Sequence, residues 1–217
     1  ESASNVVVVD GITGSGKTEV YLRSIARVLE AGKSAIVLVP EISLTPQTVG
    51  RFRSRFGDDV AVLHSRLSIG ERFDQWDLVR QGKAHVVVGT RSALFAPVSD
   101  LGLVIIDEEH DSSYKQDSSP RYDARAAAYE LTRMRGATLV LGSATPSIDT
   151  LASCEGGALG ERAWQHVMLL ERPSGQPLPD VQIVDMAAEF KGGSRSMFSQ
   201  ALVDALLGVH ERGEKAV

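Results

Sequence analysis

The strongest chemical signal in the chain is the run Gly11-Ile-Thr-Gly-Ser-Gly-Lys-Thr18, which matches G-x-x-x-x-G-K-[ST] at every fixed position. The glycines let the backbone turn tightly, so that N–H groups point at phosphate oxygens near the positive end of a helix dipole. The lysine can reach the β- and γ-phosphates of a nucleotide, and the threonine hydroxyl can hold Mg²⁺. The predicted phosphate-binding residues are Gly11, Thr13, Gly14, Ser15, Gly16, Lys17 and Thr18.

A cluster of acidic residues, Asp107-Glu108-Glu109-His110, follows the apolar run of residues 103–106. Downstream of a phosphate-binding loop, this arrangement has the form of a Walker B motif. Asp107 would help Thr18 to steady Mg²⁺, and Glu108 would orient or deprotonate the attacking water. An acidic turn without catalytic meaning is the alternative, and the phosphate-binding loop upstream favours the catalytic interpretation.

The elements that position these motifs are predicted from short apolar runs that alternate with helix-period patterns. Because strands alternating with helices form right-handed crossovers, we expect an α/β fold with a mainly parallel sheet and helices on both faces. Polar clusters then fall at the carboxyl ends of strands, where such sheets bind ligands. Phe73, Trp76 and Val79 recur at three-residue steps, and the two aromatic side chains are expected in the core. The expected strands are 5–9, 35–39, 60–63, 85–88, 103–106 and 138–141, and the expected helices begin near residues 17, 47, 70 and 124.

A change in composition near residues 171–179 indicates a linker, with Pro173, Gly175, Pro177 and Pro179 in one short segment. We therefore expect one domain over residues 1–172, and a linker with the beginning of a second domain over residues 173–217. In that second part a strand is expected at 181–184, a mobile loop at 191–196 and a helix at 198–211. The first residue is glutamate and a new apolar strand is expected at the last residues, so we expect a piece of a longer protein.

Composition limits the class of protein. The 217 residues are 43% hydrophobic and 24% charged, as in ordinary globular proteins, and the net charge of −5 gives no global basic field. A local basic stripe would suffice for nucleic acid. The single cysteine, Cys154, excludes an intrachain disulfide and a cysteine-rich zinc site in this chain, which fits a cytoplasmic location. No apolar run approaches the roughly 18 residues of a membrane span.

Other nucleotide-binding classes lack their signatures here. No N-K-x-D element of guanine-specific switches appears, and no L-S-G-G-Q stretch of transporter ATPases. The remaining interpretation is a RecA-like ATPase. The runs Asp107-Glu-Glu-His110 and Ser143-Ala-Thr145 together resemble the second and third motifs of superfamily 2 helicases, in the expected order.

Longer strings resemble a narrower group, the PriA family of bacterial primosomal replication-restart helicases. The resemblance covers nearly the whole chain. It implies a cytosolic, ATP-driven DNA helicase that moves 3′ to 5′, acts on single-stranded and forked DNA, and assembles with primosome and single-strand-binding proteins. The strings are Gly11-Ile-Thr-Gly-Ser-Gly-Lys-Thr-Glu-Val-Tyr21, Val39-Pro-Glu-Ile-Ser-Leu-Thr-Pro-Gln-Thr48, Gly89-Thr-Arg-Ser-Ala-Leu-Phe95, Ile106-Asp-Glu-Glu-His-Asp-Ser-Ser-Tyr-Lys-Gln116 and Leu141-Gly-Ser-Ala-Thr-Pro146.

The resemblance also implies roles for individual residues. Lys17, Thr18, Asp107 and Glu108 match the phosphate, magnesium and catalytic positions of the family. Residues that match the family's coupling and DNA-backbone positions are His110, Ser143, Thr145, Thr45, Thr90 and Arg91. The loop of residues 112–125 mixes aromatic and basic side chains that suit base stacking and phosphate contact, namely Tyr114, Lys115, Arg121, Tyr122 and Arg125.

Several family features lie outside this chain: a fork-recognition domain, a glutamine-containing adenine motif, paired zinc cysteines and a second lobe with an arginine finger. We therefore expect zinc in the full-length protein only, and weak hydrolysis by this chain alone. The alternatives are another superfamily 2 fork-remodelling translocase and a non-catalytic restart scaffold.

Overall fold

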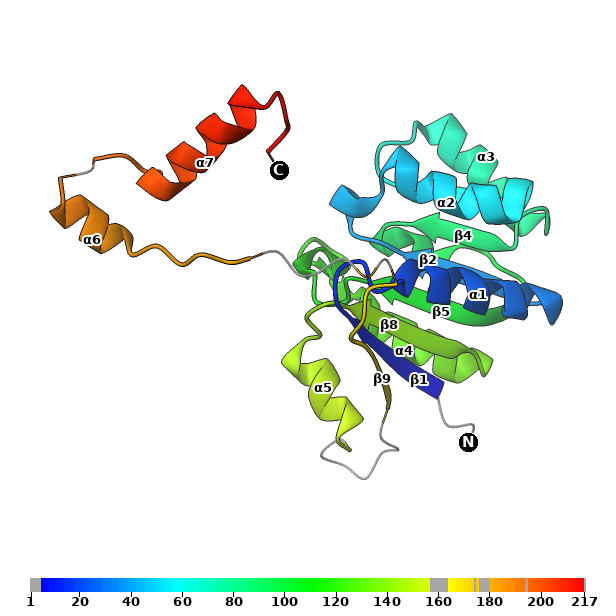
Figure 1. Ribbon diagram of the computed structural model, residues 1–217. Coiled ribbons are helices and arrows are strands. Elements are labelled where there is room, and N and C mark those ends of the chain that lie inside the picture. The colour runs from blue at the N-terminus through cyan, green and yellow to red at the C-terminus, as the bar shows by residue number, and fades with distance from the viewer. Residues whose placement is uncertain (1–4, 157–163, 174, 176–179, 194, 217) are drawn as a thin grey trace. The chain divides into compact units, whose positions relative to one another are not determined.

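The computed structural model describes residues 5–156, 164–173, 175, 180–193 and 195–216. The chain divides after Gly175 into two compact units (Figure 1). The first unit carries every motif singled out above. In the described part of the second unit are two helices, α6 (Met186–Lys191) and α7 (Gln200–Glu211). The prolines expected to end the linker, Pro177 and Pro179, lie outside the described residues, as does Ser194 in the expected loop.

A seven-stranded sheet with entirely parallel pairing forms the first unit, as the sequence predicts. Its strand order is β3-β4-β2-β5-β8-β1-β9. Since parallel neighbours need crossover connections, helices separate most of the strands. The strands are β1 (Asn5–Gly11), β2 (Ser34–Leu38), β3 (Val60–Leu63), β4 (Val86–Gly89), β5 (Leu101–Asp107), β8 (Thr138–Ser143) and β9 (Gln165–Leu169).

Helices cover both faces of this sheet (Figure 1). Side chains alternate along each strand, so that Ile36 and Leu38 of β2 pack on one face while Ala35 and Val37 pack on the other. The first face meets α3 (Ile69–Arg80) and α4 (Ala124–Arg135), and the second meets α1 (Lys17–Glu30) and α2 (Pro46–Phe56). Burial on both faces explains why these strands read as continuous apolar runs.

The parallel arrangement gathers the polar clusters at one edge of the sheet. β8 lies between β1 and β5, so the segments that follow these three strands are neighbours. They are the phosphate-binding loop, the turn after Gly142 and the acidic turn that begins at Asp107. The strand order therefore assembles one site from residues more than a hundred positions apart.

Some elements differ from the expectation. The strand expected at 181–184 does not form, because the described part of the second unit offers no partner strand. Conversely, β9, α5 (Ile148–Cys154) and the small antiparallel pair β6 (Lys115–Gln116) and β7 (Tyr122–Asp123) were not expected. In the described residues no helix is long and apolar enough to cross a membrane.

The expectation that Phe73 and Trp76 are core residues is wrong. Their exposed fractions are 65% and 37%, whereas Val79 is buried. A three-residue step turns about 300° around a helix, so three such positions drift across its surface instead of forming one stripe. Only the last of the three faces the sheet.

Candidate nucleotide-binding and catalytic site

The phosphate-binding loop runs from the end of β1 at Gly11 to the start of α1 at Lys17. Gly14 and Gly16 have φ values of 81° and 95°, a region that favours glycine. Lys17 Nζ donates to the Gly11 carbonyl oxygen at 2.6 Å. Ser15 Oγ is buried without a hydrogen-bond partner among the described residues, so a phosphate oxygen would satisfy it.

A pocket of 590 Å³ opens over this loop. Asp107 and Glu108 line it together with the loop residues from Thr13 to Thr18, so the two motifs share one cavity. The carbonyl oxygen of Thr13 accepts a hydrogen bond from Arg172 Nε at 3.0 Å. Arg51 of α2 also lines the pocket, although no motif points to it. Nothing in its helical spacing distinguishes it from Arg53 and Arg55.

Asp107 is held by a tyrosine of α1 to which the motifs assign no role. Tyr21 of α1 is 2% exposed, and its hydroxyl donates to Asp107 Oδ1 at 2.9 Å. Burial raises the pKa of Asp107, and the hydrogen bond from Tyr21 opposes that rise. Burial, with the nearby carboxylates, also raises the pKa of Tyr21, so its hydroxyl stays a donor. A buried tyrosine needs a hydrogen-bond partner for its hydroxyl, so a tyrosine on a helix that packs against the sheet was the sequence feature that could have indicated this contact.

Replacing Tyr21 with phenylalanine should weaken the response to Mg²⁺. The variant keeps the ring in the core but removes the donor that orients Asp107, and loss of such a supporting contact lowers metal affinity by about 10–100-fold. The measurement is nucleotide turnover by the full-length protein against Mg²⁺ concentration, with Tyr129→Phe on α4 as the matched control. An unchanged Mg²⁺ requirement would contradict the role of Tyr21.

Glu108 adopts an unusual backbone conformation. Its φ of 46° is positive, the only such value at a non-glycine position in the described ranges, and this strain costs about 1–3 kcal/mol. Its carboxylate lies 4.0 Å from Lys17 Nζ and 3.7 Å from His110 Nδ1. The strained turn therefore aims Glu108 at the pocket above the phosphate-binding loop.

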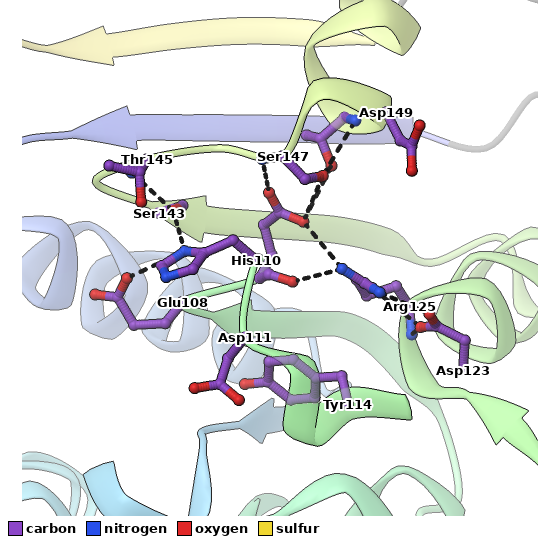
Figure 2. Close-up of polar contacts among 12 residues, drawn as sticks. Glu108, His110, Asp111, Tyr114, Asp123, Arg125, Ser143, Thr145, Ser147 and Asp149 are labelled. Atoms are coloured by element: carbon purple, nitrogen blue, oxygen red, sulfur yellow. Dashed lines mark hydrogen bonds and ion pairs between the residues drawn. The ribbon is translucent and has the colours of Figure 1, made fainter. Parts of the chain in front are cut away.

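His110 connects the acidic turn to the turn after β8. Its Nδ1 lies 2.7 Å from Ser143 Oγ, which also accepts a hydrogen bond from the Thr145 backbone N–H at 2.9 Å (Figure 2). The structure thus brings together Glu108, His110, Ser143 and Thr145, which come from two separate motifs. This chain of contacts connects the 143–145 turn to the Glu108 carboxylate.

The candidate nucleic-acid residues lie along the same edge of the sheet. Thr45 caps α2, where its hydroxyl oxygen accepts from the Thr48 N–H at 3.2 Å. Thr90 precedes the short helix of residues 91–95. The Arg91 guanidinium donates to the Ser113 carbonyl oxygen at 2.8 Å and lies 5.7 Å from the centre of the Tyr122 ring. Arg91 therefore joins the strand-end motif after β4 to the loop of residues 112–125.

Two of the predicted nucleic-acid contacts in this loop, Tyr114 and Arg125, are engaged in contacts within the protein. Tyr114 is 0% exposed, and its hydroxyl lies within hydrogen-bond distance of the carbonyl oxygens of Leu38 and Asp107, so the prediction that it stacks on bases is wrong. Arg125 is bonded to the Asp123 carboxylate and the Glu109 carbonyl oxygen instead of facing solvent. Both side chains instead hold the loop against the sheet.

The other three predicted contact residues of this loop stay accessible. Lys115 is exposed, and so is Arg121, whose Nε donates to the Asp117 carbonyl oxygen at 2.9 Å. Tyr122 is half-buried, in edge contact with Phe95 at 5.3 Å between ring centres. These three side chains retain the polar and aromatic surface that the nucleic-acid prediction requires.

Comparisons with known proteins agree with the geometry. The profile of the DEAD/DEAH box helicase family matches residues 2–153. The replication restart protein PriA of Bacillus subtilis is 49% identical over 212 residues, which are 98% of this chain and 26% of that protein. The PriA protein of Synechocystis is 50% identical over 201 residues, or 92% of this chain and 24% of that protein. The chain thus spans about a quarter of the length of these relatives.

A solved structure of RecG bound to a three-way DNA junction is similar over 81% of this chain and 22% of that chain. The TM-score is 0.54 and the sequence identity is 27%. This likeness agrees with the RecA-like helicase fold that the motifs predicted.

Proposed function

Since the chain belongs to the DEAD/DEAH box helicase family, we propose that it is the ATP-binding lobe of a DNA helicase of replication restart. The similarity to replication restart protein PriA, expected from the motifs, is confirmed over nearly the whole chain. One observation carries the proposal: Lys17, Asp107 and Glu108 line a single pocket, although their motifs lie about ninety positions apart in the sequence. The helicase of which this lobe is part moves 3′ to 5′ on DNA.

The pocket fits ATP and Mg²⁺. The orphaned Ser15 hydroxyl and the loop N–H groups suit phosphate oxygens, and Thr18 with Asp107 would hold the ion. Bound Mg²⁺ would neutralise charge that develops on the transferred phosphoryl group.

Lys17 binds the terminal phosphates, and Glu108 orients the attacking water and accepts its proton. The nearby His110 transmits conformational changes that depend on the nucleotide to Ser143 and Thr145.

The DNA side of the lobe uses the residues that remain accessible at the carboxyl edge. Hydroxyl and guanidinium groups contact phosphates, and the Tyr122 ring meets a base. The contact residues are Thr45, Thr90, Arg91, Lys115, Arg121 and Tyr122. The partners are single-stranded and forked DNA with primosome and single-strand-binding proteins, in the cytoplasm. Residues 173–217 begin a second lobe, and zinc belongs to the parts of the full-length protein beyond this chain.

Steady-state ATP hydrolysis by the full-length protein tests this function, with forked DNA, single-stranded DNA and no DNA compared. We expect turnover that forks stimulate and that Lys17→Ala removes, because the lysine holds the terminal phosphates. ATP turnover that depends on Lys17 but does not change when DNA is added would refute the proposed DNA-contact residues. Absence of any turnover would support a non-catalytic restart scaffold.

The similarity to RecG favours a second candidate, another fork-remodelling translocase. The two candidates differ outside this chain, because the resemblance to the PriA family implies paired zinc-binding cysteines in the second lobe. Zinc content of the full-length protein, measured by atomic absorption, separates them. Stoichiometric zinc favours the restart helicase, and its absence favours the translocase.

A further inference from the structure

Glu109 is a buried acidic residue that takes no part in the proposed hydrolysis of ATP. It is 0% exposed, and among the described residues it is the only acidic or basic residue in the buried class. Burial of a carboxylate is unfavourable unless it is paired and hydrogen-bonded. The Glu109 carboxylate, next to Glu108 in the chain, should therefore have several hydrogen-bond donors around it.

The Glu109 carboxylate gathers donors from a segment about forty residues further along the chain. It accepts hydrogen bonds from the Ser147 backbone N–H at 2.6 Å, the Ser147 hydroxyl at 3.3 Å and the Thr150 hydroxyl at 3.1 Å. The three donor groups belong to two residues at the start of α5, its N-cap Ser147 and Thr150, shortly after the 143–145 turn. The side chain thus ties the acidic turn to the segment that follows β8.

The same residue also meets the loop of residues 112–125. Arg125 Nη1 donates to the Glu109 carbonyl oxygen at 3.0 Å and lies 3.9 Å from its carboxylate. The other guanidinium atoms bind the Asp123 carboxylate, at 3.0 Å from Nε and 2.7 Å from Nη2 (Figure 2). Asp123 directly follows Tyr122. Glu109 is therefore the point where the loop, the acidic turn and the 143–150 segment meet.

We propose that Glu109 is a positioning residue, which fixes the strained Glu108 turn and links it through Arg125 to the DNA-facing loop. The Glu109 backbone N–H donates to the Gly142 carbonyl oxygen at 3.0 Å, so both main chain and side chain of Glu109 are anchored. A strained conformation persists only where its surroundings over-determine it. This inference rests on the proposed function, since it assigns Glu109 to the reaction of Glu108.

The test is a kinetic comparison of Glu109→Gln with the parent in the full-length protein, with and without single-stranded DNA. The amide keeps the shape but loses the charge that Arg125 faces and one acceptor position. We expect kcat to fall by about 10²-fold, because a small misplacement of a catalytic group has effects of that size, while KM for ATP stays unchanged. The matched control is Glu130→Gln, an exposed residue of α4 paired with Arg133.

A double-mutant cycle separates linkage from general weakening. If Glu109 and Arg125 act in one network, Arg125→Lys should add little to the kcat loss of Glu109→Gln. Multiplicative losses, a wild-type kcat, or a rise in KM without a kcat loss would each overturn the proposal. Should Glu109→Gln not fold, Thr150→Val decides, since it keeps the volume and removes one donor: reduced kcat supports the proposal and normal kcat refutes it.

The outcome is distinguishable from failure of the proposed function. If the parent hydrolyses ATP without any response to DNA, the helicase assignment fails. A kcat loss in Glu109→Gln measured without DNA would still support its positioning of Glu108.

Discussion

Replacing Glu108 with glutamine should leave ATP binding intact and reduce turnover by the full-length protein by about 10²–10⁴-fold, the usual contribution of a general base. Glutamine keeps the size of the side chain but cannot accept the proton of the attacking water. The strained turn, with φ of 46°, and the 4.0 Å distance to Lys17 Nζ place this carboxylate at the pocket that would hold the terminal phosphates and the attacking water. Binding persists because Lys17 and the loop N–H groups hold the phosphates.

Steady-state hydrolysis together with titration of a fluorescent ATP analogue measures both effects. Glu30→Gln is the matched control, because Glu30 is an exposed residue at the end of α1 that pairs with Arg27 at 3.5 Å. A Glu108→Gln protein with normal turnover would show that another group activates the water. Loss of binding and turnover together would assign Glu108 to the nucleotide site instead.

Replacing Gly142 with alanine should damage both stability and catalysis. A Cβ atom there would lie 1.6 Å from the Tyr21 hydroxyl oxygen and 2.7 Å from Cζ of the same ring. Tyr21 is enclosed by the core and holds Asp107, so it cannot move without disturbing that carboxylate. Overpacking of this kind costs about 1–3 kcal/mol. We therefore expect a lower melting temperature and a weaker response to Mg²⁺.

Thermal unfolding of the full-length protein measures the stability effect. Gly50→Ala in α2 is the control, because its Cβ would meet nothing within 4 Å, and removing glycine from a helix should stabilise by roughly 0.5–1 kcal/mol. Adding Tyr21→Phe to Gly142→Ala removes the atom in closest contact and should restore part of the lost stability. If Gly142→Ala melts at the parent temperature, the Tyr21 packing is not as rigid as described.

Much of the site follows from the sequence because its motifs are local. The phosphate-binding loop needs only glycines and a lysine at fixed spacing, and the structure forms it between β1 and α1 as predicted. Six of the seven sheet strands follow from apolar runs, since burial on both faces leaves a continuous pattern. β9 escaped because it lies at the sheet edge with mostly exposed side chains, so its sequence carries no such pattern.

The sequence by itself determined the motifs and their supports: a glycine-rich loop with its lysine, an acidic turn and the strands that carry them to one edge. Only the tertiary structure decided which neighbours hold those groups. It buried Tyr114, which the loop composition predicted to be accessible, and it joined Tyr21 to Asp107 and Glu109 to Thr150. The physical reason is distance along the chain. Spacing and periodicity report on residues within a few turns, whereas these contacts join residues 86 and 41 positions apart and depend on strand order.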